Sequence, residues 1–197
     1  MKCFFISKKS IILLTIACLV ILFYNMSFST NNNLDYTIPE LQYTLNELYD
    51  STEKVAYLTF DDGPSTKETE KILDILNKEN IKATFFVIGK KVKEQPNIVK
   101  RTYEEGHYIA NHGYSHNNSE LYKNSQTFIS EIKNTDLEIS KAIGVDNYHS
   151  QIFRFPNGYI APIYKSQKKQ MLTELNKIGY SYIDWNWLNK DSEIKYS

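Results

Sequence analysis

Along this chain, short continuous runs of hydrophobic residues alternate with segments in which hydrophobic residues recur at helical spacing. This pattern predicts strands separated by amphipathic helices. Short apolar runs predict strands at residues 55–60, 83–88, 107–110, 152–154 and 180–185. Apolar residues at helical spacing predict helices at residues 66–79, 96–106, 125–143 and 164–178. This alternation predicts the α/β class, with a parallel sheet that is covered by helices and forms either an open sheet or a barrel.

Three polar clusters follow predicted strands directly. They occupy residues 61–64, 111–116 and 154–158. In open parallel sheets and in barrels alike, ligands bind at the carboxyl ends of the strands. The pattern therefore predicts one functional site that is built from all three clusters.

The first thirty residues have the pattern of a signal peptide or membrane anchor. They carry three lysines and no acidic residue, and an apolar run occupies residues 11–24. The run is short for a membrane span, which needs about twenty residues, but it lengthens if Met26 and Phe28 are included. Because no small-x-small cleavage site follows, the sequence favours an uncleaved anchor and predicts an extracytoplasmic protein, anchored or secreted.

The remaining residues predict one domain with a short lead-in. Residues 31–53 are expected to form a linker and a helix that starts after Pro39, and residues 54–197 the domain itself. Removing the three leader lysines from 23 leaves 20 basic residues against 23 acidic ones, which argues against a nucleic-acid partner. Both cysteines, Cys3 and Cys18, lie in the leader, so no disulfide is expected in the domain, which we expect to be a monomer.

Adjacent carboxylates at Asp61 and Asp62 are the first candidate for chemistry. Like charges this close repel unless a cation separates their roles, for example a metal on one and an arginine on the other. Arg154 could supply that arginine, and the turn after it could present a backbone N–H to a ligand. Taken alone, Asp-Asp-Gly-Pro fits an ordinary turn equally well.

His112 and His116 are the second candidate. They are four residues apart, so one helical turn would aim both rings in the same direction, as two ligands of one ion require. The pair alone is also compatible with two surface histidines. With a carboxylate as third ligand, the set describes a catalytic metal centre that keeps open coordination positions.

The clusters at residues 59–64, 112–116 and 154–158 resemble, in order, motifs of the polysaccharide deacetylases with a NodB homology domain, carbohydrate esterase family 4. The resemblance implies a deformed, incomplete parallel (β/α) barrel. It also implies a divalent metal, with zinc expected and cobalt or nickel as alternatives.

The resemblance implies a role for each matching residue. Asp61 would be the general base, and Arg154 would position it. Asp62, His112 and His116 would bind the metal.

Other positions are expected to contact the substrate. By the same resemblance, the backbone of Pro156, Asn157 and Gly158 would help to hold the acetyl oxygen. Trp185 ends a predicted strand beside the motifs and is expected to line the acetyl pocket. Asp191 matches a fourth motif, in which an aspartate tunes a late catalytic histidine.

The chain departs from the family pattern at its C-terminal end. No histidine follows His149, which lies in a polar loop and is expected to be a solvent-exposed residue. The expected function is removal of N-acetyl groups from an amino-sugar polymer, with peptidoglycan N-acetylglucosamine ahead of chitin-type oligomers. The alternatives are a C-terminally shortened, catalytically impaired protein that binds metal or glycan, and an amidase with a non-sugar substrate.

Overall fold

The computed structural model describes residues 38–50, 52 and 54–186. The expected leader at residues 1–30 lies outside the described residues, as do Asp191 and the first part of the linker. None of the described helices is long and apolar enough to cross a membrane.

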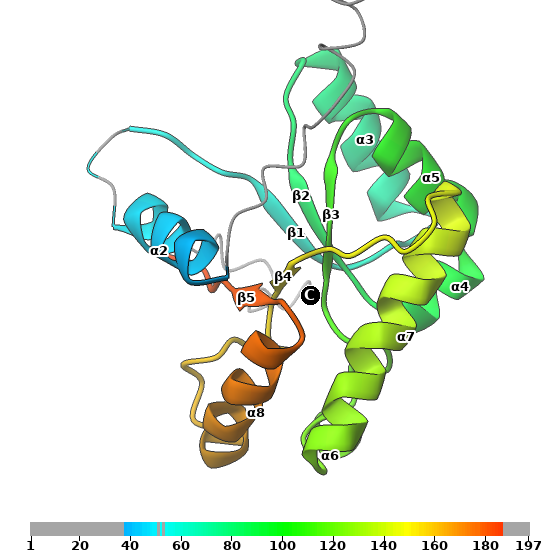
Figure 1. The fold of residues 1–197 in the computed structure, drawn as a ribbon. Coiled ribbons are helices and arrows are strands. Elements are labelled where there is room, and N and C mark those ends of the chain that lie inside the picture. The colour runs from blue at the N-terminus through cyan, green and yellow to red at the C-terminus, as the bar shows by residue number, and fades with distance from the viewer. Residues whose placement is uncertain (1–37, 51, 53, 187–197) are drawn as a thin grey trace, which may run out of the picture. The chain divides into compact units, whose positions relative to one another are not determined.

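The described part of the chain forms a five-stranded parallel sheet in which sequence order is also spatial order (Figure 1). Its strands are β1 (Thr59–Gly63), β2 (Thr84–Val87), β3 (Tyr108–Asn111), β4 (Ile152–Phe153) and β5 (Ser181–Tyr182). All four neighbouring pairs are parallel. The parallel α/β arrangement that the alternation predicts is confirmed.

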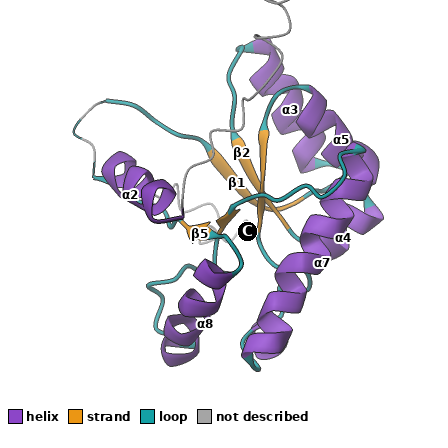
Figure 2. Cartoon of the chain, in the orientation of Figure 1, coloured by secondary structure: helices purple, strands orange, loops and turns teal. Residues whose placement is uncertain are grey.

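Helices connect the strands, and α3, α4, α5 and α7 lie along one side of the sheet (Figures 1 and 2). The described helices are α2 (Ile38–Tyr49), α3 (Glu68–Lys78), α4 (Gly89–Glu94), α5 (Pro96–Glu104), α6 (Asn118–Leu121), α7 (Ser125–Ile143) and α8 (Lys165–Lys177). The lead-in helix α2 is attached to β5, because the side-chain amide of Gln42 bonds both the N–H and the carbonyl of Tyr182.

Two apolar clusters form the core, and α7 contributes to both. Ile139 packs with Phe85 and Ile109 of the sheet and with residues of α3, α4 and α5. Further toward the start of α7, Phe128 packs with Phe153 and with residues of α6 and α8. The long helix therefore links the two halves of the sheet.

Local chemistry sets the bounds of α7, which agree with the predicted range. The side-chain oxygen of Asn124 accepts a hydrogen bond from the N–H of Thr127, as an N-cap does. Gly144 ends the helix in the left-handed region at φ 71°, where a glycine has no steric penalty.

The first strand differs from its prediction. The apolar run at residues 55–60 predicts a strand there, but β1 starts at Thr59 and extends through both aspartates to Gly63. The register pairs Thr59 with Thr84, and the carbonyl of Leu58 accepts a hydrogen bond from the N–H of Thr84, so the described ladder starts there. Val55 and Tyr57 are accordingly more than half exposed, at 57% and 65%.

Replacing Phe128 by alanine should lower the free energy of unfolding by about 3–5 kcal/mol, because its ring is fully buried against Phe153 and Phe155. Urea unfolding would measure the change. Leu137→Ala is the matched control, since Leu137 lies on the same helix and is 51% exposed, and it should cost within about 0.5 kcal/mol. Equal losses in the two variants would contradict the assigned core.

Candidate metal centre

The sheet brings the three predicted metal ligands together. Asp62 lies at the end of β1, and His112 and His116 follow β3. One oxygen or nitrogen from each of the three lies within 4.8 Å of the others. Asp62 and the two histidines, which come from the ends of different strands, therefore lie together as predicted.

Asp62 is the acceptor at the centre of the cluster. Its Oδ1 lies 3.0 Å from Nε2 of His116 and 3.4 Å from Nε2 of His112. The backbone at Asp62 is left-handed, with φ 64°, and its carbonyl accepts a 2.6 Å hydrogen bond from Nζ of Lys91. Sequence patterns did not single out Lys91, which lies on α4 and holds the Asp62 backbone in place.

A backbone carbonyl determines which nitrogen of His112 faces the cluster. Nδ1 of His112 lies 2.7 Å from the carbonyl oxygen of Arg154, and a carbonyl can only accept. Nδ1 therefore carries the proton of the neutral ring, and Nε2 keeps a lone pair that points toward Asp62 and His116. An N–H bonded to a carbonyl in this way is typical of metal-binding histidines.

The segment between the two histidines corrects one prediction. Spacing predicted a helical turn, but residues 112–116 form an irregular loop. Gly113 and His116 both adopt left-handed backbone conformations, at φ 81° and 54°, which a helical turn does not contain. The ring centroids still lie only 5.1 Å apart, so the loop achieves the proximity that a helix was expected to give.

Asp61, next to Asp62 in sequence, has a different environment. Its Oδ1 accepts a 2.9 Å hydrogen bond from Nη1 of Arg154, which is 1% exposed. Its Oδ2 is buried and has no hydrogen-bond partner among the described residues. Burial raises the pKa of Asp61, and the charge of Arg154 opposes that rise.

Arg154 is enclosed on both faces of its guanidinium. The guanidinium carbon lies 3.9 Å from the ring centroid of Phe86 and 4.9 Å from that of Trp185. Nε donates to the carbonyl of Ile183, and Nη1 also donates to the hydroxyl of Thr59. Trp185, which was predicted to line the acetyl pocket, thus covers the arginine that holds Asp61.

The turn at Pro156, Asn157 and Gly158 is fixed from two sides. Asn157 and Gly158 have φ values of 65° and 77°, and a Cβ on Gly158 would lie 3.0 Å from the Trp185 ring. The carboxylate of Asp184 accepts from the next backbone N–H, that of Tyr159, at 2.9 Å. Asp184 directly precedes Trp185 in the chain, but no sequence pattern singled it out.

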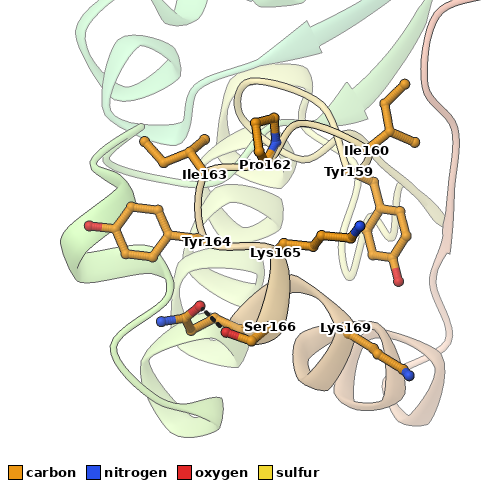
Figure 3. A pocket seen from close by; sticks show the side chains of 9 residues that line it. Tyr159, Ile160, Pro162, Ile163, Tyr164, Lys165, Ser166 and Lys169 are labelled. Atoms are coloured by element: carbon orange, nitrogen blue, oxygen red, sulfur yellow. Dashed lines mark hydrogen bonds between the residues drawn. The ribbon is translucent and has the colours of Figure 1, made fainter.

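A cavity of about 1010 Å³ begins one residue beyond this turn, between the loop at residues 159–164 and the start of α8. Tyr159 and Tyr164 lie on opposite sides of it, and the Lys165 side chain extends toward Tyr159 (Figure 3). Its lining combines aromatic, aliphatic and basic side chains, and no acidic residue lines it.

His149 belongs to a different cluster. It is 40% exposed, as expected for a surface histidine, but both ring nitrogens are engaged. Nδ1 lies 3.3 Å from a carboxylate oxygen of Asp136, and Nε2 lies 3.0 Å from the carbonyl oxygen of Gly179. His149 is therefore a bonded structural residue.

Electrostatics and donor types in the cluster of Asp62, His112 and His116 fit a divalent cation. Contacts of Asp62 Oδ1 with Nε2 of His112 and of His116 hold the pKa of Asp62 well below its ordinary value, and the Asp62 contact raises the pKa of His116. The carboxylate is therefore ionised at neutral pH. One carboxylate oxygen and two imidazole nitrogens form a known zinc donor set that leaves positions open for other ligands.

Comparisons with known proteins agree with this arrangement. The family model described as polysaccharide deacetylase matches residues 49–183. The chain is 36% identical over 144 residues to a peptidoglycan-N-acetylglucosamine deacetylase of Bacillus cereus, covering 73% of this chain and 49% of that protein. It is 34% identical over 166 residues to a putative polysaccharide deacetylase of Bacillus subtilis, covering 84% and 54%. The chain thus spans about half the length of these curated relatives.

Solved structures give the same answer for the fold. A polysaccharide deacetylase of Bacillus cereus matches with a TM-score of 0.57 and 38% identity, covering 68% of this chain and 61% of that one. A carbohydrate esterase of family 4 from Streptococcus mutans matches with a TM-score of 0.62 and 30% identity, covering 74% and 61%. The predicted NodB-type fold, a deformed and incomplete parallel barrel, is confirmed. The chain belongs to the polysaccharide deacetylase family, the carbohydrate esterases with a NodB homology domain.

Proposed function

We propose that this protein is a metal-dependent hydrolase that removes N-acetyl groups from an amino-sugar polymer, with peptidoglycan N-acetylglucosamine as substrate. One observation carries the proposal. Asp61 has a buried oxygen that no described residue bonds, and the adjacent residue Asp62 completes a three-residue cluster that fits a divalent metal. Base and metal ligands are thus neighbours, which amide hydrolysis by an activated water requires.

Asp62, His112 and His116 would hold the metal, with zinc expected and cobalt or nickel as alternatives. When bound, the ion would supply a Lewis acid that polarises an amide carbonyl and lowers the pKa of a water molecule. The protein's part is to present three ligand atoms from one side. The Arg154 carbonyl orients His112, and Lys91 holds the Asp62 backbone.

Asp61 would act as the general base and take the proton of the attacking water on its free Oδ2. Arg154 donates a hydrogen bond to Oδ1, so Oδ1 is engaged by the arginine and Oδ2 can accept the proton. Arg154 also favours the ionised form of Asp61, which burial alone would disfavour. The pair therefore gives Asp61 both an orientation and a basic oxygen.

The turn at Pro156, Asn157 and Gly158 would face the acetyl group. A backbone N–H after Pro156 is proposed to donate to the oxygen on which negative charge develops, a contact whose loss typically costs about 10²- to 10³-fold in rate. Trp185 packs on Gly158 and on the Arg154 guanidinium, so it would form the wall of the acetyl pocket.

The choice of substrate rests on the relatives. Several of them are named peptidoglycan-N-acetylglucosamine deacetylases, and one is named a peptidoglycan-N-acetylmuramic acid deacetylase. An extracytoplasmic location, with residues 1–30 as membrane anchor or signal peptide, would place the enzyme beside such a polymer. We propose that it acts there as a monomer.

Replacing Asp61 by asparagine should reduce acetate release by about 10²- to 10⁴-fold, because the amide cannot accept the proton of water. Acetate released from peptidoglycan and from N-acetylglucosamine oligomers, with zinc or cobalt added, would measure the change. Asp74→Asn is the control, since the Asp74 carboxylate is exposed on α3 and bonds only Arg101 among the interactions described. It should leave the rate unchanged.

Two outcomes of this assay would contradict the proposal. Equal rates for Asp61→Asn and the parent would remove Asp61 from the base role. A folded parent that binds metal but releases no acetate would favour the alternative of a metal- or glycan-binding protein without turnover.

Replacing His116 by alanine should weaken zinc or cobalt binding by more than about 100-fold. Loss of a residue that only supports a metal ligand typically costs about 10- to 100-fold, and His116 is proposed to be a ligand itself. Two ligands would remain where the cluster provides three. Calorimetric titration of the metal-free protein would measure affinity and stoichiometry. His149→Ala is the control, because His149 bonds Asp136 and Gly179 outside the cluster, and unchanged binding in both variants would contradict the assigned centre.

A further inference from the structure

The loop between the two histidine ligands has an unusual hydrogen-bonding pattern. Three consecutive backbone N–H groups, those of Gly113, Tyr114 and Ser115, all donate to side-chain oxygens. Two of them share a single acceptor, Oε2 of Glu131 on α7. A loop with this shape cannot satisfy its own N–H groups, so its conformation depends on side chains from elsewhere.

We propose that Glu131 is a positioning residue for the metal centre and shapes the His112–His116 loop before any metal binds. This inference rests on the metal-binding part of the proposed function and deepens it. Glu131 would act through the loop, because its carboxylate bonds the loop's donors and lies outside the ligand cluster.

The contacts of Glu131 are short and converge on one atom. Oε2 lies 2.8 Å from the N of Tyr114, 2.7 Å from the N of Ser115 and 3.0 Å from the Ser115 hydroxyl. Hydrogen bonds to an ionised acceptor are about twice as strong as those between neutral groups. A carboxylate in this position therefore stabilises the irregular conformation of the loop.

Asn111 extends the same attachment to the start of the loop. Its Oδ1 accepts from the N of Gly113, and its Nδ2 donates to the carbonyl of Ile132 and to Asp136, both on α7. Asn111 directly precedes His112 and is fully buried. Asn111 before the first histidine, and Tyr114 and Ser115 after it, are thus tied to one helix.

The carbonyl side of the loop is bound as well. The carbonyls of Gly113 and Tyr114 accept from the N–H groups of Gly89 and Lys90 at the start of α4. A Cβ on Gly89 would lie 2.5 Å from the Tyr114 ring, so only glycine allows this approach. These contacts use backbone groups of α4, whereas Glu131 and Asn111 are side chains that a substitution can remove.

The test compares Glu131→Ala and Glu131→Gln with matched changes at Glu138. Glu138 lies on the same helix, is also partly buried, and bonds the exposed side chain of Lys141. Cobalt titration of the metal-free proteins, followed by visible absorption, would give the affinity and the ligand geometry. Amide hydrogen exchange of Tyr114 and Ser115 would report the loop without metal.

Glu131→Ala should weaken cobalt binding by about 10- to 100-fold and alter the cobalt spectrum, with Glu131→Gln in between, while the Glu138 variants match the parent. The amides of Tyr114 and Ser115 should be protected in the metal-free parent and exchange faster in Glu131→Ala. If the alanine variant does not fold, the glutamine variant carries the same comparison.

Parental cobalt affinity in the Glu131 variants, or unprotected amides in the metal-free parent, would overturn the inference. Deacetylation plays no part in the titration. A parent that binds cobalt with the expected Glu131 dependence but releases no acetate would overturn the proposed activity and support the positioning role. A parent that binds no cobalt would overturn both.

Discussion

The buried guanidinium of Arg154 is the interaction on which the arrangement of the site depends. Arg154 follows β4, yet it reaches β1 through Thr59 and Asp61 and stacks on Phe86 of β2. Its carbonyl holds His112 after β3. Removing one partner of a buried ion pair costs about 3–5 kcal/mol, so this residue has both an energetic and a geometric role. One residue, through its side chain and its backbone carbonyl, thus contacts the strands that carry the site.

That arrangement explains how two adjacent carboxylates have different tasks. Asp61 points to the buried arginine, whereas the left-handed backbone of Asp62 turns its side chain toward the histidines. Burial raises the pKa of Asp61, and the contacts with Nε2 of His112 and of His116 lower that of Asp62. Neighbours in sequence thus differ in partner, exposure and basicity, as the proposed roles of base and metal ligand require.

The sequence predicted those features that local chemistry determines. The helix at residues 125–143 was correct at both ends because Asn124 and Gly144 act on their immediate neighbours. The polar clusters that follow the strands lie close together, as predicted, because parallel strands end at a common edge. The helical turn at residues 112–116 was wrong, because the N–H groups of this loop bond Glu131 of another element and its backbone is left-handed at Gly113 and His116. The position of β1 was wrong because its partner strand determines where pairing begins.

A catalytic metal centre faces a constraint that a structural one does not. A closed site with four ligands can organise its loops through the ion itself, whereas a site with open positions has fewer ligands to do so. The protein must then hold its three ligands by other means. Here a carbonyl orients His112, Lys91 fixes the Asp62 backbone, and Glu131 binds the loop before His116. Each of the three proposed ligands therefore has its own support from the protein.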